Sequence, residues 1–410
     1  MVRIRVGVTV GYERDRVMQL RTGVAEEVGM STRRLRGVVR IAERWVAQGT
    51  TQALVLLVAR RGAIVLHEAL GRLTPDDDAP SVKRDTIYPM TSLTKPITAT
   101  AAMTLVEEGL LSLQRPVSDY IPEFIGEGKQ MVMVHHLLTH TSGLRDEDVL
   151  AHAEKKRDLV TIPRPEETQH PLIGEMLWLR YDAPLWKAPG VEMCYSNYGY
   201  NLLGEVVRRV SGQSLADLAS DRIFQPLRME DTFYVVPESV RARIVRRPAE
   251  APFTIGVVAP GLGTRGHEEL PLASAGVYST AADIAVFGQM FLNRGSYGDV
   301  RILSPASVSE MTRNQIPGIS SRWVDEFFPE ATWGLGWSIH GNKKALRGGS
   351  LHSPQAFSHQ GAGGIGVWVD PVYDLVGVYF SVVLEMIDSL HAKTCFDLFM
   401  NGVTAAVVDA

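Results

Sequence analysis

One S-x-x-K tetrapeptide, Ser92-Leu-Thr-Lys95, occurs in this chain, and an apolar helical pattern begins directly behind it. Three residues along an α-helix are close to one turn, so the hydroxyl and the amine project from the same face within contact range. A serine hydroxyl attacks a carbonyl only when a base takes its proton. The pair therefore predicts a serine nucleophile beside its base, at the positive end of a helix dipole. A capping serine with a solvated lysine is the alternative, so the motif needs support from the rest of the chain.

Lys95 can act as that base only if its amine is partly neutral. Bringing a lysine pKa from about 10.4 to near neutrality requires ~4 kcal/mol of differential destabilisation of the cation. We therefore expect Lys95 to be buried or to lie beside another positive charge.

Tyr195 and Asn197 lie about a hundred residues downstream, in Cys194-Tyr-Ser-Asn197. A phenol next to Ser92 and Lys95 can act as a general base and then as a general acid to the leaving group. An asparagine offers donors and an acceptor that orient a lysine and a substrate. The alternative is that Tyr195 is a packed aromatic residue ahead of an amphipathic helix over 201–210.

A third segment, His359-Gln-Gly-Ala362, precedes a strand pattern. Small residues let a substrate approach the backbone closely, so the Ala362 N–H and the Ser92 N–H predict a two-donor oxyanion hole. Residues 361–366 also fit G-x-G-x-x-G, but a strand and a turn follow where a dinucleotide site needs a helix. We therefore set the dinucleotide interpretation aside.

Together, S-x-x-K, Y-x-N and H-x-G resemble the serine β-lactamase and penicillin-binding superfamily, in particular its class C β-lactamase-like branch with the family VIII carboxylesterases. The resemblance runs from about residue 53 to the C-terminus. It implies that Ser92 is acylated, that Lys95 and Tyr195 share the general-base role, that Asn197 positions substrate and that Ala362 donates the second oxyanion N–H. It extends to three segments without chemistry of their own: 136–144 (HLLTHTSGL), 274–280 (SAGVYST) and 333–337 (WGLGW).

Two departures from the family pattern affect the expected substrate and a helix end. Penicillin-recognising members usually carry K-T-G on the third strand, whereas this chain has His359-Gln360-Gly361. Neutral histidine and glutamine make a weak anchor for a carboxylate, which favours neutral esters as substrates. Arg228 stands where the family commonly has glycine.

The expected fold class is α+β, with an antiparallel sheet flanked by helices and an inserted, mainly helical lobe. We expect residues 1–116 and 267–410 to form one discontinuous sheet domain, residues 117–266 to form the helical lobe, and the active site to lie between them. The sequence predicts a helix directly behind Ser92 and further helices over 32–48, over 281–293 and from 391. It predicts strands over 1–10, 53–58, 63–70, 364–370 and 375–384. Long connections are expected over 145–170 and 235–252.

Composition limits the partners. With 42 basic and 46 acidic residues the net charge is −4, so no polybasic field serves nucleic acid, and no apolar run reaches the ~20 residues that span a bilayer. Cys194 and Cys395 are too few for a disulfide framework, and the N-terminus does not resemble a signal peptide, so we expect a cytoplasmic protein. His136 and His140 have a zinc-like i, i+4 spacing, but no further ligand motif supports a metal or cofactor.

The function expected from the sequence is a serine carboxylesterase that cleaves short-chain esters through an acyl-enzyme on Ser92. His359, Gln360 and Gly361 would contact the substrate together with Asn197. A β-lactamase or D-amino-acid peptidase with the same nucleophile is the alternative within enzymes, and a catalytically silent acyl-binding or penicillin-sensing module is the alternative outside them. The expected partner is a small-molecule ester or amide, and a homo-oligomer stays open.

Overall fold

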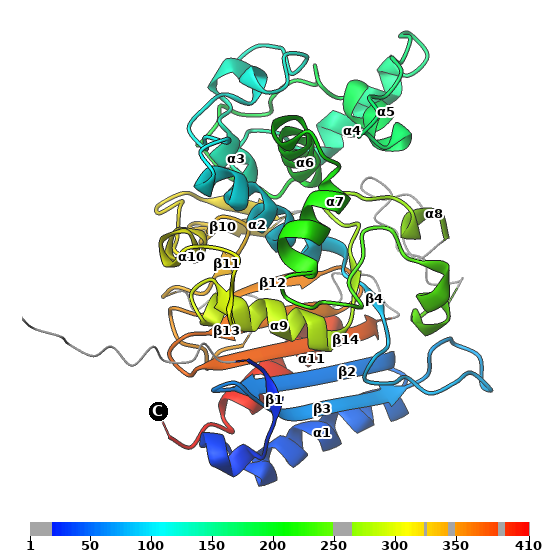
Figure 1. Cartoon of the computed structure of the whole chain (residues 1–410), viewed down its shortest axis with the longest axis vertical. Coiled ribbons are helices and arrows are strands. Elements are labelled where there is room, and N and C mark those ends of the chain that lie inside the picture. Colours follow the sequence, from blue (N-terminus) through cyan, green and yellow to red (C-terminus); the bar gives the residue numbers. More distant parts are fainter. Residues whose placement is uncertain (1–18, 249–264, 324–325, 343–348, 384–389, 410) are drawn as a thin grey trace, which may run out of the picture.

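A computed structural model describes residues 19–248, 265–323, 326–342, 349–383 and 390–409. The strand expected over residues 1–10 lies outside these ranges. Figure 1 shows one large sheet with helices on both faces and a group of further helices beyond it.

The central sheet has seven strands in the order β1-β3-β2-β14-β13-β12-β11. Its neighbouring strands pair antiparallel except at one edge, where β1 runs parallel to β3. The expected antiparallel sheet flanked by helices is therefore confirmed, with the two-residue edge strand β1 as a parallel addition. The strand bounds are Arg21–Thr22 (β1), Thr51–Arg60 (β2), Ala63–Gly71 (β3), Ser338–Ile339 (β11), Phe357–Gly361 (β12), Ile365–Asp370 (β13) and Leu375–Val383 (β14).

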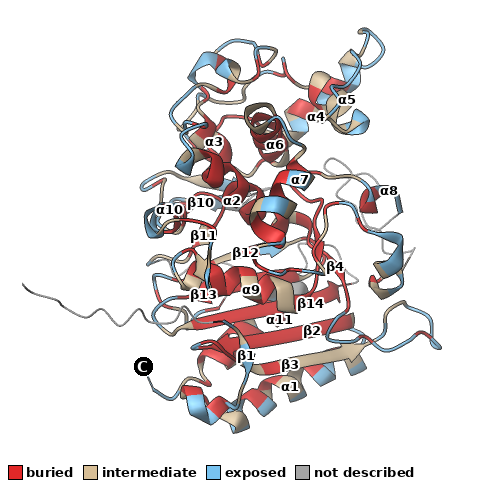
Figure 2. Ribbon diagram, viewed as in Figure 1, coloured by how far each residue is buried: buried red, intermediate tan, exposed pale blue. Residues whose placement is uncertain are grey.

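Strand β2 carries apolar side chains on both faces, so both faces of the sheet are covered by other elements. Its side chains alternate between two apolar clusters: Leu54, Leu56 and Val58 pack on one face, and Val55 and Leu57 on the other. Figure 2 shows β2 and β14 as buried, as expected for central strands covered on both faces. Helices α1 (Thr32–Ala47) and α11 (Leu390–Thr404) cover the first face, and α9 (Ala281–Leu292) covers the second.

Beyond α9, the helix behind Ser92 lies at the centre of a helical group. This helix, α2 (Thr94–Glu107), is buried along most of its length and packs against α6 and α7. The other helices are α3 (Val134–Leu138), α4 (Asp146–Lys156), α5 (Pro171–Trp178), α6 (Asn197–Ser211), α7 (Leu215–Ala219), α8 (Arg265–Glu268) and α10 (Pro305–Met311). Short strands elsewhere are β4 (Tyr88–Pro89), β5 (Met193–Cys194), β6 (Tyr278–Ser279), β7 (Ser296–Tyr297), β8 (Val300–Arg301), β9 (Ser321–Trp323) and β10 (Glu326–Phe328). Short 3-10 helices are η1 (Ala25–Val28), η2 (Thr91–Leu93), η3 (Val117–Asp119), η4 (Lys129–Met131) and η6 (Glu238–Arg243), and η5 (Ser220–Phe224) is a π-helix.

Helix α4 corrects the sequence interpretation of residues 145–170 as an open connection. Three acidic residues occupy its first turn and two lysines its last turn, which complements the helix dipole at both ends. Within α4, the side chains of Val149 and Ala153 are buried. Its four apolar residues cluster within five positions of an otherwise charged segment, which gives too little periodicity to stand out as a helix in the sequence. Similarly, η6 lies within the connection expected over 235–252.

Two local features concern a helix start and a backbone conformation. Thr280 caps α9 by accepting a hydrogen bond from the Asp283 N–H, while the Asp283 carboxylate accepts from the Asp231 N–H and the Thr232 hydroxyl. Arg228 has a φ of 55°, in the left-handed region that favours glycine. Arg228 therefore adopts a backbone conformation that the glycine common in the family would adopt with less strain.

Candidate active site

Ser92 lies in η2, immediately before α2, and Lys95 is in the first turn of α2. The Lys95 amine is fully buried and donates to Ser92 Oγ at 3.1 Å, to Asn197 Oδ1 at 2.7 Å and to the Ser274 carbonyl at 3.0 Å. Ser92 itself is partly exposed. The pair therefore has the geometry of a reachable hydroxyl with a buried base, and the solvated-lysine alternative does not apply.

The charge on Lys95 is disfavoured by its surroundings. Burial lowers the pKa of the amine to about 7, although the negative charge of Asp146 acts in the opposite direction. Neutral and charged amine are therefore both substantially populated near pH 7, which is what a general base in this position requires.

Tyr195 contacts the same pair. Its ring lies beneath the Lys95 amine, 4.7 Å from the ring centroid. Burial raises the pKa of the phenol above its usual range, and a hydrogen bond with Ser92 acts against this shift. Tyr195 is thus a neutral phenol near pH 7 that can carry a proton. Burial disfavours the phenolate, which is the form that could take the first proton from Ser92.

Aromatic residues fix the plane of the Tyr195 ring. His140 stacks on it at a centroid distance of 4.2 Å, and Trp333 meets it edge-on at 5.9 Å. His140 Nδ1 also accepts from the Ser196 N–H, which joins the histidine to the Tyr195 segment. With a φ of 58° His140 lies outside α3, so His136 and His140 do not share a helix face as a zinc pair would. No group of three or more metal-binding side chains occurs in the part of the chain that the structure describes.

Asn197 begins α6 and links Lys95 to Asp146. Its Oδ1 accepts from Lys95, while its Nδ2 donates to Asp146 Oδ2 at 2.9 Å. The carboxylate of Asp146 also accepts from the Ser196 hydroxyl at 2.7 Å and from the N–H groups of Asn197 and Tyr198 at 2.8 and 3.2 Å. No motif in the sequence points to Asp146. Its position two residues after the HTSGL segment was the one feature that could have drawn attention to it.

The third segment lies on β12 and at its end. His359 is buried, and its Nδ1 lies 2.8 Å from the Gln360 carbonyl, so Nδ1 carries the proton that it donates. Burial and the neighbouring Lys95 hold the pKa of His359 at about 3, so the ring is neutral. Gln360 is exposed at the strand end. The position that carries a lysine in K-T-G is therefore uncharged in this chain.

Gly361 and Ala362 meet the turn that carries Ser92. A Cβ at Gly361 would lie 2.3 Å from Thr91 Oγ1 and 2.5 Å from the Met90 carbonyl oxygen, so the glycine is required by contact with η2 as well as by any approaching substrate. The Thr91 hydroxyl donates to the Ala362 carbonyl at 3.3 Å. Residues 361–366 turn from β12 into β13, which leaves no helix for a dinucleotide site.

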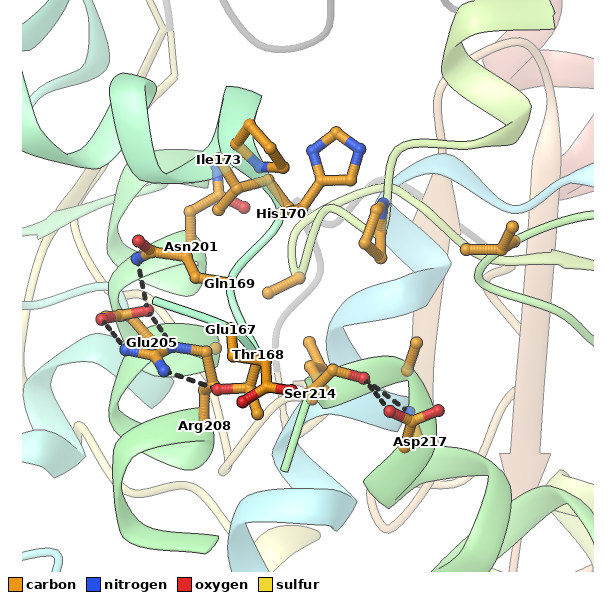
Figure 3. A pocket seen from close by; sticks show the side chains of 17 residues that line it. Glu167, Thr168, Gln169, His170, Ile173, Asn201, Glu205, Arg208, Ser214 and Asp217 are labelled. Carbon is orange, nitrogen blue, oxygen red and sulfur yellow. Dashed lines mark hydrogen bonds and ion pairs between the residues drawn. The ribbon is translucent and has the colours of Figure 1, made fainter. Parts of the chain in front are cut away.

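A separate cavity of about 470 Å³ runs along α6 (Figure 3). Asn201, Glu205 and Arg208 line it, on the helix stripe that starts at Asn197, whereas Ser92, Lys95 and Tyr195 do not. Arg208 is paired with Glu205 and Glu166. The charges of Arg208 and Glu205 in this cavity thus compensate each other.

Comparisons with known proteins identify the family and the fold. The family described as Beta-lactamase matches residues 38–389. A putative D-alanyl-D-alanine carboxypeptidase of Escherichia coli K12 is 27% identical over 392 residues, covering 87% of this chain and 84% of the relative. Esterase EstB of Burkholderia gladioli is 37% identical over 191 residues, covering 46% of this chain and 48% of the esterase. A family VIII carboxylesterase structure shares the fold with a TM-score of 0.67 at 22% identity, covering 90% of this chain and 98% of that one.

Proposed function

The chain belongs to the beta-lactamase family of serine hydrolases, and from this premise we propose that it is a carboxylesterase that cleaves short, neutral esters through an acyl-enzyme on Ser92. The observation that carries the proposal is the uncharged His359 at the position of the family's lysine. EstB, which is named as an esterase, supports it through 37% identity over about half of each chain.

Acylation would begin with the neutral Lys95 amine. Lys95 takes the Ser92 proton, directly or through the Tyr195 phenol, while Oγ attacks the ester carbonyl. The N–H groups of Ser92 and Ala362 hold the oxyanion. The proton on Lys95 then passes through Tyr195 to the leaving alkoxide as its C–O bond breaks, so the alcohol departs neutral and Ser92 keeps the acyl group. Water attacks this second ester while Lys95, through Tyr195, takes the water proton and passes it to Ser92 Oγ as the acid leaves, which restores the starting state.

The substrate class follows from charge. A penicillin or a peptide C-terminus presents a carboxylate, and a cation beside it is worth ~1.5 to 3 kcal/mol when it donates a hydrogen bond. His359 is a neutral ring whose Nδ1 proton is already used by Gln360. A neutral ester loses nothing by this replacement, so esters are favoured relative to β-lactams.

The test compares the two substrate classes in the native protein and in His359→Lys with Gln360→Thr. The native enzyme should hydrolyse short p-nitrophenyl esters far faster than penicillins or cephalosporins. The double variant should raise kcat/KM for the antibiotic relative to the ester by roughly 10- to 150-fold. A native enzyme that prefers a β-lactam over every ester would overturn the esterase assignment and favour a β-lactamase or D-amino-acid peptidase. Intact-mass detection of Ser92 phosphonylated by a fluorophosphonate shows whether the serine is a reactive nucleophile, and ester turnover separates an active enzyme from a silent acyl-binding module.

A further inference from the structure

Asp146 occupies a position from which it can control the catalytic lysine without contacting it. Its carboxylate accepts four hydrogen bonds from three consecutive residues, 196–198, directly after Tyr195. Three of these come from the N-terminal end of α6, where a carboxylate also meets the positive end of the helix dipole. A helix cap alone would account for these contacts, but not for the fourth.

The fourth contact is the one to the Asn197 side chain, and it fixes the direction of the amide. An asparagine amide can point either end toward a neighbour. Because Asp146 Oδ2 is an acceptor, it takes the Nδ2 end at 2.9 Å, which leaves Oδ1 facing Lys95 at 2.7 Å. With the amide reversed, an N–H donor would face a lysine that has only donors when charged.

We propose that Asp146 is a positioning residue for acyl transfer, which holds the Asn197 amide so that Lys95 keeps an acceptor and remains aligned with Ser92. This inference rests on the proposed role of Lys95 as the base. Asp146 touches neither Ser92 nor the Lys95 amine through any hydrogen bond in the described residues, so it acts through Asn197 and through its charge.

The charged and titratable neighbours of Lys95 determine in which direction the pKa of Lys95 changes when the Asp146 carboxylate is removed. His140 and His359 are held neutral by burial and by the Lys95 charge, and Tyr195 is a neutral phenol. Asp146 is therefore the negative charge that favours the Lys95 cation, and Arg180, on the Asp146 side, opposes part of its field. Removing the carboxylate should move the ionisation of Lys95 to lower pH by roughly one unit. A reversed Asn197 amide would move it in the same direction.

The experiment measures the rate of Ser92 phosphonylation by a fluorophosphonate, and kcat and KM for a short p-nitrophenyl ester, across pH. Asp146→Ala should lower kcat roughly 10²-fold through misalignment, with little change in KM. Asp146→Asn keeps the shape of the side chain and one acceptor oxygen. Its kcat should fall roughly 10-fold, because a neutral acceptor makes a weaker hydrogen bond than a charged one. The acid limb of kcat/KM should shift to lower pH in both variants.

Glu147→Gln is the matched control, because Glu147 is exposed and lies next to Asp146 in the same turn of α4. It removes one negative charge that solvent screens, so its rate and acid limb should equal those of the wild type. Asp146→Ala in an Asn197→Ala background should cost no further activity, since the amide that Asp146 orients is already gone.

Each outcome bears on the inference. Asp146 variants that lose thermal stability but keep the wild-type kcat and acid limb would reduce Asp146 to a helix cap. An undiminished loss in the Asn197→Ala background would overturn the route through Asn197. A wild type that labels with the fluorophosphonate yet hydrolyses no ester refutes the proposed substrate, while the labelling rates of the variants still decide the role of Asp146. A wild type that never labels at Ser92 refutes both.

Discussion

The pH dependence of ester hydrolysis should report the ionisation of Lys95. Burial lowers the pKa of this amine from an ordinary value of 10.5 to about 7. At pH 7 about half of the enzyme would then hold a neutral base, compared with roughly one molecule in 3,000 for an unshifted lysine. Burial of Lys95 therefore increases the reactive fraction about 10³-fold.

The assay follows kcat/KM for a short neutral ester from about pH 5 to about pH 10, where this ratio reports the free enzyme. The rate should rise through about pH 7 and then stay level, because the pKa of Tyr195 is raised above its usual range and its ionisation does not end the plateau. An acid limb at or above about pH 9 would refute the lysine assignment. A fall in rate near the ordinary pKa of tyrosine, about 10, would refute the assignment of Tyr195 as a buried neutral phenol.

Folding stability gives an independent check on the same shift. Because the folded-state pKa of Lys95 lies below its unfolded value, the unfolded chain holds a proton between about pH 7 and pH 10.5 that the folded chain lacks. The free energy of unfolding therefore rises with pH in this window, by at most about 1.4 kcal/mol per pH unit. Lys95→Met removes the titrating group, so the stability gained by this variant over the wild type should shrink as pH rises. Urea unfolding of both proteins at several pH values measures the difference, and a difference independent of pH would contradict the buried-base argument.

Three further substitutions test single features of the site and its surroundings. Tyr195→Phe keeps the stack on His140 but removes the proton carrier, so kcat should fall roughly 10²-fold or more with little change in Tm; normal kcat with a large loss of Tm would indicate a packed aromatic only. Gly361→Ala places a Cβ against Thr91 and the Met90 carbonyl, so both urea stability and the Ser92 acylation rate should fall, and a neutral result would contradict the close contact. Arg228→Gly removes a left-handed penalty of roughly 1–2 kcal/mol, offset in part by the flexibility of glycine in the unfolded chain, so stability should stay level or rise slightly with unchanged activity; a clear loss of stability would show that the Arg228 side chain makes contacts that matter.

The sequence predicted residues that the structure places together around Ser92, because the proposed chemistry restricts those positions to few residue types. Ser92 and Lys95 are three residues apart where η2 continues into α2, so local geometry alone places them together. Tyr195 and Asn197 required the family resemblance, since no periodicity joins residues a hundred positions apart. The fold was accessible for a similar reason: β2, β3, β13 and β14 are apolar runs bounded by clear turns, and each lies within a few residues of its predicted range.

Residues that orient the catalytic groups were much harder to find. Any carboxylate at the right point in space can hold the Asn197 amide, so no motif specifies Asp146, and the polar character of α4 made its segment resemble a connection. His140 was assigned to structure alone, although it stacks on Tyr195. Among described residues no helix is long and apolar enough to cross a membrane. The boundaries at residues 116 and 266 and the cytoplasmic location stay predictions.

Backbone strain beside the nucleophile has a physical explanation in the same contacts. Thr91 has a φ of 46°, a left-handed conformation that is rare for a β-branched residue and costs roughly 1–2 kcal/mol. Its buried hydroxyl reaches the Ala362 carbonyl across 271 positions of sequence, and Gly361 leaves the space that this approach needs. A glycine at position 91 would relieve the strain but would remove the hydroxyl that joins the turn of Ser92 to the end of β12. Because the two proposed oxyanion donors belong to these two segments, the strained residue contributes to holding them at a fixed separation.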